Sequence, residues 1–214
     1  MSRTVGRINP MKILYWTGYF IAKIAGRVIF RGRIIGKEHV PRSGGFILAS
    51  NHRSYFDPPL AGSATGREMA FFAKAELFAV PVLGSLIRRT NAMPVKRGSV
   101  DRDALKTAVA TIRKGYGLTV FPEGTRSRDD SFLEPKPGLG LIALHAECPI
   151  VPCYLHGTNK LKQCLLGREK LRVAFGEPLP VEWVRSFPKS KEGYVQLARE
   201  VMDRIAKIKA ASGL

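Results

Sequence analysis

The sequence predicts an α/β fold, in which a central mixed β-sheet is flanked by helices and preceded by an amphipathic N-terminal helix. The first observation behind this prediction is that short apolar, β-rich runs alternate with helical patterns from residue 46 onward. The second is that polar clusters directly follow three of these runs, where loops at strand ends usually carry the chemistry. The third is an amphipathic segment at residues 11–30.

Each element is predicted from a local pattern. The apolar runs predict strands at residues 46–50, 69–74, 92–95, 118–121, 150–155 and 171–175. A helix is predicted to begin at Asp57, which can cap it with Pro58 in its first turn. Further helices are predicted at 99–114, 139–147 and 192–210. The first of these three has Ser99 and aspartates at its start and Gly115 after its end.

Residues 11–30 are the most apolar stretch, but cations interrupt it before it reaches the roughly 18–20 apolar residues of a spanning helix. At about 100° per residue, Lys12, Lys23 and Arg27 fall within an arc of about 60°. The opposite side carries Ile13, Leu14, Ile21, Ile24 and Val28, and the stripe is flanked by Trp16, Tyr19 and Phe20. This pattern is typical of a helix lying in a membrane interface, although a helix packed on its own domain is the alternative. We therefore predict an N-terminal membrane-associating helical segment at residues 1–35 and an α/β domain at residues 36–214.

The charge of the chain is strongly unbalanced. With 35 Lys and Arg against 17 Asp and Glu, the formal net charge is +18. Such a surface attracts nucleic acid, anionic lipid, phosphorylated substrates or an acidic carrier protein. The clustered aromatics of RNA-binding modules are missing, as are the GxSxG, GxxxxGK[ST], GxGxxG and HExxH motifs. Cys148, Cys153 and Cys164 are odd in number and not spaced as CxxC, which indicates a reducing, cytoplasmic setting.

The stretch SNHRSYFD at residues 50–57 places a histidine and an aspartate after the first strand. Five residues put His52 and Asp57 on different sides of a helix, but across a tight turn they can converge. Asp57 would then hold the Nδ1 proton of His52 and leave Nε2 as a general base. The alternative gives Asp57 a helix cap and His52 a loop position. These eight residues alone favour the alternative.

The stretch FPEGTRSR at residues 121–128 follows another strand. Arg126 and Arg128 suit a phosphate, Gly124 permits close backbone approach, and Glu123 can position a hydroxyl or an arginine. A solvated turn is the alternative. Lys96 and Arg97 follow a third strand, and Lys74 ends a fourth; singly, each is more typical of a surface turn.

Four blocks, in order across residues 51–152, resemble the glycerolipid acyltransferase family, the 1-acyl-glycerol-3-phosphate acyltransferases. NHRSYFD resembles the NHxxxxD block of that family, KAELFAVPVLGSLIRRTNAMPVKRG its second block, FPEGTRSR its third and CPIVPC its fourth. The chain departs from the second block at Lys96, which stands where an acidic or polar residue is usual. The resemblance implies that residues 36–214 form an acyltransferase domain.

The resemblance also implies roles for individual residues. His52 would be the general base that activates a glycerol hydroxyl, and Asp57 would orient it. The glycerol phosphate and acyl chain would be bound by residues of the other blocks, namely Lys74, Arg97, Glu123, Gly124, Thr125, Arg126 and Pro152. Asn51 is a further candidate, for the oxyanion. No cofactor or metal is expected, and acyl-coenzyme A or acyl carrier protein would be the co-substrate.

The predicted partners follow from this reaction. They are lysophosphatidic acid, anionic membrane lipids and the acyl thioester, without nucleic acid, on the cytoplasmic face of the cell membrane as a peripheral protein. The product would be phosphatidic acid. One alternative is an acyltransferase acting on another lysolipid or glycolipid, and another is a basic membrane-binding protein without catalytic activity.

Overall fold

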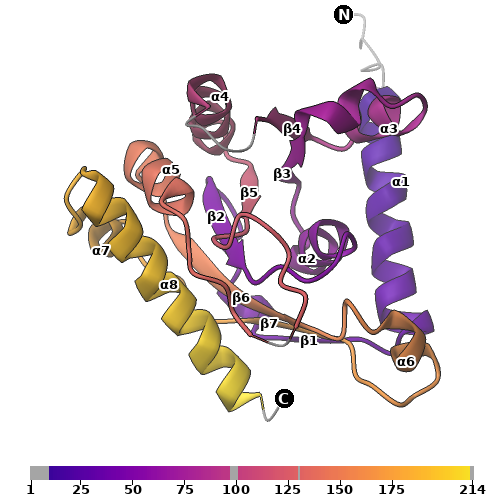
Figure 1. The fold of residues 1–214 in the computed structure, drawn as a ribbon. Helices are drawn as coiled ribbons and strands as arrows, with labels where there is room; N and C mark the ends of the chain where they lie inside the picture. Colours follow the sequence, from indigo (N-terminus) through magenta and orange to yellow (C-terminus); the bar gives the residue numbers. More distant parts are fainter. Residues whose placement is uncertain (1–9, 97–100, 130, 213–214) are drawn as a thin grey trace, which may run out of the picture.

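The computed structural model describes residues 10–96, 101–129 and 131–212, with the side chains of the first helix described from Tyr15 onward (Figure 1). The strands are β1 (Arg33–Ile35), β2 (Phe46–Ser50), β3 (Met69–Lys74), β4 (Ala92–Val95), β5 (Gly117–Val120), β6 (Ile150–His156) and β7 (Arg172–Phe175). The helices are α1 (Pro10–Ile24), α2 (Asp57–Thr65), α3 (Leu83–Arg88), α4 (Arg102–Arg113), α5 (Gly138–Ala146), α6 (Leu161–Leu165), α7 (Val181–Arg185) and α8 (Lys191–Ala211). A π-helical turn, η1 (Ala25–Ile29), continues α1.

The strands form one mixed sheet in the order β1-β7-β6-β2-β5-β3-β4. Strands β2, β3, β4, β5 and β6 run parallel to one another, whereas β7 is antiparallel to β6 and β1 is parallel to β7. The carboxyl ends of the five parallel strands therefore meet at one edge of the sheet, which we call the carboxyl edge. The predicted fold class, a mixed sheet flanked by helices, is confirmed.

Helices cover both faces of the sheet (Figure 1). Successive side chains of a strand point to opposite faces, so a strand made of apolar residues must be covered on both. In β2, Ile47 and Ala49 pack in one core with α4, α5, α7 and α8. Phe46 and Leu48 pack in a second core with α2. Every residue of β2 is buried, as expected for a parallel strand covered on both faces.

The predicted strands and long helices are present, and the additional elements are short. Among the strands and α-helices that the structure describes, β1, α3, α6 and α7 had not been predicted, and each has three to six residues. Asp101 is the N-cap of α4, where its side chain accepts a hydrogen bond from the backbone N–H of Ala104. Ser99, predicted at the start of this helix, lies outside the described residues. The strand β1 joins the sheet, and the division of the chain at residue 35 stays a prediction.

Helix α1 packs on α2 through one face and exposes apolar side chains on another. Tyr15 and Tyr19 are buried, and the Tyr15 hydroxyl accepts a hydrogen bond of 2.8 Å from the backbone N–H of Met69. The exposed apolar residues of α1 and η1 are Phe20, Ile21, Ile24, Val28 and Ile29. Within the described parts of the chain, no helix is both long and apolar enough to cross a membrane.

Helix α6 sits in a loop between β6 and β7 that is fastened to the sheet by Glu169. The Glu169 carboxylate accepts hydrogen bonds from the backbone N–H of Lys170 at 2.9 Å, from the His156 ring at 3.0 Å and from Lys160 Nζ at 3.4 Å. These bonds, led by that from Lys170 N–H, lower the pKa of Glu169 from 4.5 to about 2. The loop is therefore held most firmly at pH values at which the Glu169 carboxylate is ionised.

The loss of this carboxylate makes stability less dependent on pH. Because the folded pKa lies below the ordinary one, its contribution is present above pH 4.5 and is lost as the pH falls toward about 2. We expect Glu169→Gln to lower the free energy of unfolding near pH 7 by about 1 kcal/mol, since the group is partly exposed, and to flatten its decline in acid. Urea unfolding at several pH values measures this, with exposed Glu200→Gln on α8 as the control. Equal acid slopes in all three proteins would contradict the prediction.

Candidate active site

Two loops meet at the carboxyl edge, one after β2 and one after β5. The backbone N–H of His52 donates to Glu123 Oε1 at 2.9 Å, and the backbone N–H of Ser127 donates to the carbonyl of His52 at 2.8 Å. Strands β2 and β5 are neighbours in parallel register, so the NHRSYFD and FPEGTRSR stretches leave the sheet side by side. The two most informative sequence motifs therefore form one site.

The imidazole of His52 and the carboxylate of Asp57 are in direct contact. His52 Nδ1 lies 2.8 Å from Asp57 Oδ2, and the same oxygen accepts the backbone N–H groups of Arg53 at 2.6 Å and Ser54 at 2.7 Å. Asp57 is completely buried. Its carboxylate thus points back into the loop before α2 instead of capping that helix. The tight turn brings together the two residues that helical spacing would separate.

A second contact fixes the plane of the His52 ring. The ring stacks on Phe121, with centroids 4.0 Å apart and an interplanar angle of 19°. Among the residues that the structure describes, none hydrogen-bonds Nε2 of His52. With Nδ1 held by Asp57 and one ring face held by Phe121, Nε2 is the nitrogen available for chemistry. This geometry suits a general base.

Glu123 connects the two loops rather than facing outward. Its Oε1 accepts the backbone N–H of His52, and its Oε2 accepts that of Leu133 at 3.0 Å. Burial raises the pKa of this carboxyl, and the two amide bonds oppose that effect. Both oxygens are therefore used to position the backbone. A direct contact of Glu123 with substrate stays a prediction, and these bonds favour a positioning role.

Exposed cations lie beside this turn. Arg126 places its guanidinium 3.6 Å from the ring centroid of Tyr55, and both side chains are exposed. Gly124 has φ +68°, and a Cβ at this position would lie 2.9 Å from Cδ of Lys136. The stem of Lys136 thus passes directly over Gly124. Two exposed cationic side chains beside one turn would suit an anionic ligand.

The sequence model of the acyltransferase family matches residues 31–156, which is more than half of the chain. The chain belongs to the acyltransferase family. The matched range includes both loops of the site and six of the seven strands of the described sheet, β1 to β6.

Several named acyltransferases are similar to this chain in sequence, and one of known structure is also similar in fold. It is 29% identical to the 1-acyl-sn-glycerol-3-phosphate acyltransferase of Bacillus subtilis over 177 residues, covering 82% of this chain and 87% of that one. The crystal structure of the 1-acyl-sn-glycerophosphate acyltransferase PlsC from Thermotoga maritima has a TM-score of 0.69 at 26% identity, covering 96% of this chain and 85% of that chain. The lyso-ornithine lipid O-acyltransferase of Pseudomonas aeruginosa is 29% identical over 137 residues, covering 64% of this chain and 51% of that protein.

The remaining predicted site residues of the acyltransferase occupy varied positions. The amide of Asn51 bonds both backbone groups of Leu155, at 3.0 Å and 2.8 Å, so its contacts favour joining β2 to β6 over the predicted oxyanion role. Pro152 is buried within β6, and Lys74 is exposed at the end of β3, on the carboxyl edge. Thr125 is exposed beside Arg126. Arg97 lies outside the described residues.

Three contributors to the site were missed from the sequence. They are Phe121, Tyr55 and Lys136, which contact the His52 ring, Arg126 and Gly124. Phe121 and Tyr55 belong to the quoted stretches, but they act through their aromatic rings, and nothing in the local sequence indicates what those rings contact. Lys136 follows the FPEGTRSR stretch by eight residues, and the folding back of its loop is shown by the bond from Lys136 N–H to the carbonyl of Pro122.

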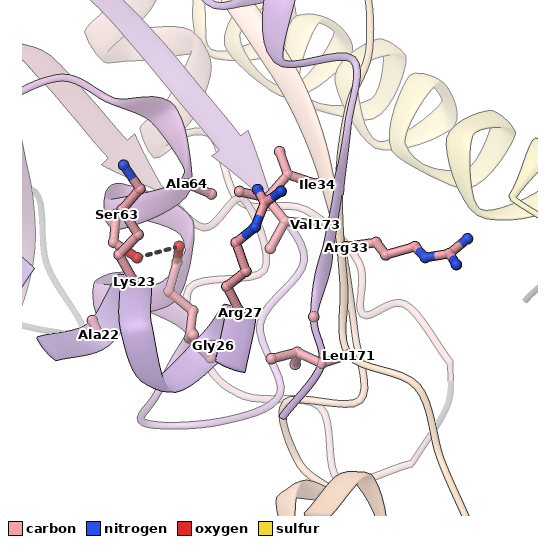
Figure 2. A pocket seen from close by; sticks show the side chains of 12 residues that line it. Ala22, Lys23, Gly26, Arg27, Arg33, Ile34, Ser63, Ala64, Leu171 and Val173 are labelled. Atoms are coloured by element: carbon pink, nitrogen blue, oxygen red, sulfur yellow. Dashed lines mark hydrogen bonds between the residues drawn. The ribbon is translucent and has the colours of Figure 1, made fainter. Parts of the chain in front are cut away.

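A cavity beside α1 is too small to be the substrate site of the acyltransferase. Figure 2 shows it between α1, α2, β1 and β7, with Arg27 extending toward Ile34 and Arg33 pointing away. Its volume is about 30 Å³, enough for roughly one water molecule and far below the space that an acyl chain needs. In the described part of the chain, no cluster of three or more His, Cys, Asp or Glu side chains is arranged to hold a metal ion.

The three cysteines are free thiols, and all are buried. Burial raises the pKa of Cys148 to about 12, and it also raises the pKa of Cys153 and of Cys164. Cys153 lies opposite Ser50 in the ladder between β6 and β2.

The clamp formed by Glu123 can be tested by its effect on stability. In Glu123→Gln, the side-chain NH₂ replaces one acceptor and faces a buried backbone N–H, so we expect a loss of roughly 1–3 kcal/mol in the free energy of unfolding. Urea unfolding measures this. The matched control is Glu134→Gln in the same loop, where an exposed ion pair with Arg199 is removed at a cost of about 0–1 kcal/mol. Similar losses in both variants would argue against the clamp.

Proposed function

We propose that this acyltransferase moves a fatty acyl group from a thioester to the free hydroxyl of 1-acyl-glycerol-3-phosphate and thereby forms phosphatidic acid. The observation that carries the proposal is the His52–Asp57 contact of 2.8 Å at the carboxyl edge, with Nε2 of His52 available. The names of the Bacillus subtilis and Thermotoga maritima relatives support the choice of acceptor. Acyl-coenzyme A and acyl carrier protein both offer the required thioester.

The proposed reaction proceeds by direct transfer. Nε2 of His52 takes the proton of the acceptor hydroxyl while its oxygen attacks the thioester carbonyl. The tetrahedral intermediate then expels the thiolate, which receives the proton from His52. The carboxylate of Asp57 keeps the Nδ1–H tautomer in place and stabilises the transient imidazolium. Phe121 keeps the ring plane fixed, so the proton is transferred in both directions by one positioned nitrogen.

The acceptor phosphate is proposed to bind beside Gly124. Arg126 offers a guanidinium that can bond two phosphate oxygens, and Lys136 adds a second positive charge over the same turn. Glu123 supports this pocket indirectly because it holds the backbone on which His52 and Leu133 lie. The base and the phosphate site are thereby set at a fixed separation.

The acyltransferase is further proposed to work as a peripheral protein on the cytoplasmic face of the cell membrane. The exposed apolar side chains of α1 and η1 and the net charge of +18 support contact with anionic lipid.

A second candidate function is transfer to a different lysolipid. It is favoured by the similarity to the lyso-ornithine lipid O-acyltransferase of Pseudomonas aeruginosa, at the same identity of 29% as the Bacillus subtilis relative. A panel of lysolipids, with products resolved by mass, separates the two candidates. The phosphate-binding proposal requires that acceptors without a phosphate react more slowly.

Removal of the base is the central test of the mechanism. We expect His52→Ala to lower the rate of transfer from labelled acyl-coenzyme A to lysophosphatidic acid by roughly two to four orders of magnitude. Asp57→Asn should also lower kcat strongly because an amide favours the wrong tautomer of His52. The control is His145→Ala, which removes an exposed histidine of α5 and should leave the rate unchanged. Equal product from wild type and His52→Ala would contradict the mechanism.

The stack of Arg126 on Tyr55 predicts a graded effect on acceptor binding. We expect Arg126→Ala to raise KM for lysophosphatidic acid about tenfold or more, since it removes a charge-assisted contact. Tyr55→Ala should raise KM about two- to fivefold, the scale of an exposed cation–π contact, while Tyr55→Phe retains the ring and the wild-type KM. Arg199→Ala on α8 is the control. Identical KM values for Tyr55→Ala and Tyr55→Phe would exclude a positioning role for the ring.

A further inference from the structure

The loop around α6 presents two adjacent leucines to the outside. Leu165 is 59% exposed and Leu166 65% exposed, whereas Cys164, directly before them, is 3% exposed. Large apolar side chains exposed together mark a contact surface more often than chance. We call Leu165 and Leu166 the leucine tip.

The leucine tip points outward from a well-anchored loop. On the inner side of α6, Leu161 and Cys164 pack in a small core with Phe30, Leu60 and Leu171. The backbone N–H groups of Arg168 and Glu169 both donate to the carbonyl of Gln163 and close the turn behind the tip. The Glu169 bonds then fasten the loop to His156 and Lys160. The outward direction of the tip is thus built into the fold.

The leucine tip lies next to the exposed apolar end of the first helix. Ile24, Val28 and Ile29 are each more than half exposed at this end. The small core joins the two regions because Phe30 follows Ile29 and Cys164 precedes Leu165. Figure 1 shows α6 beside the end of α1 that leads into β1.

The surroundings of both apolar groups are strongly basic. Residues 15–35 and 157–172 contain nine cations and one acid: Lys23, Arg27, Arg31, Arg33, Lys160, Lys162, Arg168, Lys170 and Arg172 against Glu169. The carboxylate of that acid is already bound to His156 and Lys160. Projecting apolar side chains ringed by cations are the pattern expected for contact with an anionic bilayer.

This surface lies at the same edge of the sheet as His52. Strand β6 runs parallel to β2, so the α6 loop leaves the sheet at the carboxyl edge. Strand β1 runs opposite to β2, so η1 enters the sheet at that edge as well. A membrane contacted by both would lie on the side of the molecule from which His52 is reached.

We propose that the leucine tip is a second membrane contact, which together with the apolar end of α1 and η1 docks the carboxyl edge on an anionic bilayer. The inference rests on the proposed function for its choice of lipid as the source of substrate. Two contacts from distant parts of the chain fix the orientation of the protein on the leaflet. A single helix would leave the protein free to rotate about the helix axis.

Vesicle binding of the full chain tests the proposal. We expect Leu165→Glu/Leu166→Glu to lower the partition coefficient onto mixed phosphatidylcholine and phosphatidylglycerol vesicles at least about tenfold. The matched control is Ala110→Glu/Gln196→Glu, which makes the same charge change at exposed positions of α4 and α8, on the opposite face of the sheet. It should bind like wild type. Ile24→Glu/Val28→Glu serves as the comparison for the first contact.

Two outcomes overturn the proposal. Equal binding of the leucine-tip variant and the control would leave the first helix as the anchor. Equal binding with a lower molecular mass of the variant in solution would assign the tip to contact between copies of this chain. Acyl transfer between soluble short-chain substrates distinguishes this proposal from the proposed function. If the leucine-tip variant retains this transfer and still binds vesicles like wild type, only the second membrane contact is contradicted. If wild type lacks this transfer but the leucine-tip variant binds vesicles more weakly, only the proposed function is contradicted.

Discussion

The buried carboxylate of Asp57 is the interaction on which the geometry of the site depends. An ionised carboxylate without partners in a protein interior would be very costly, and here one oxygen accepts two backbone N–H groups and the His52 ring. These three hydrogen bonds fix the conformation of the turn between β2 and α2. Glu123 does the same for the neighbouring loop by accepting two amides from segments ten or more residues away. Two acidic side chains thus hold in place the backbone of a site in a protein of net charge +18.

Much of the sheet could be predicted because its strands are buried on both faces and read as continuous apolar runs. FILAS of β2 is the clearest example, since all five residues are buried. Strand β1 was missed because three residues of alternating exposure carry too little pattern, and its pairing with β7 depends on contacts between residues about 140 positions apart. The same limit applies within the site. The family resemblance paired His52 with Asp57, although the local residues alone favoured a helix cap. Only the fold shows that Asn51 bonds Leu155 and that Glu123 faces backbone amides.

The first helix shows how two opposed interpretations can apply to different faces of one element. Tyr15 and Tyr19 pack on the domain, as the alternative interpretation required, and Ile21, Ile24 and Val28 remain exposed, as the membrane hypothesis required. The helical pattern could not separate these because aromatic residues suit both a membrane interface and a packed face. The contact between the Tyr15 hydroxyl and Met69 ties this helix to the start of β3. A force on the helix from a bilayer would therefore reach the sheet directly.

The burial of all three cysteines has a chemical consequence for a protein that handles thioesters. An acyl thioester reacts with any accessible thiolate by exchange, so an exposed cysteine near the donor would become acylated itself. Burial keeps Cys148, Cys153 and Cys164 both protonated and out of reach at neutral pH. The hydroxyl of the acceptor then competes with no nucleophilic sulfur of the protein. The packing of the core thus protects these thiols from acylation by the donor.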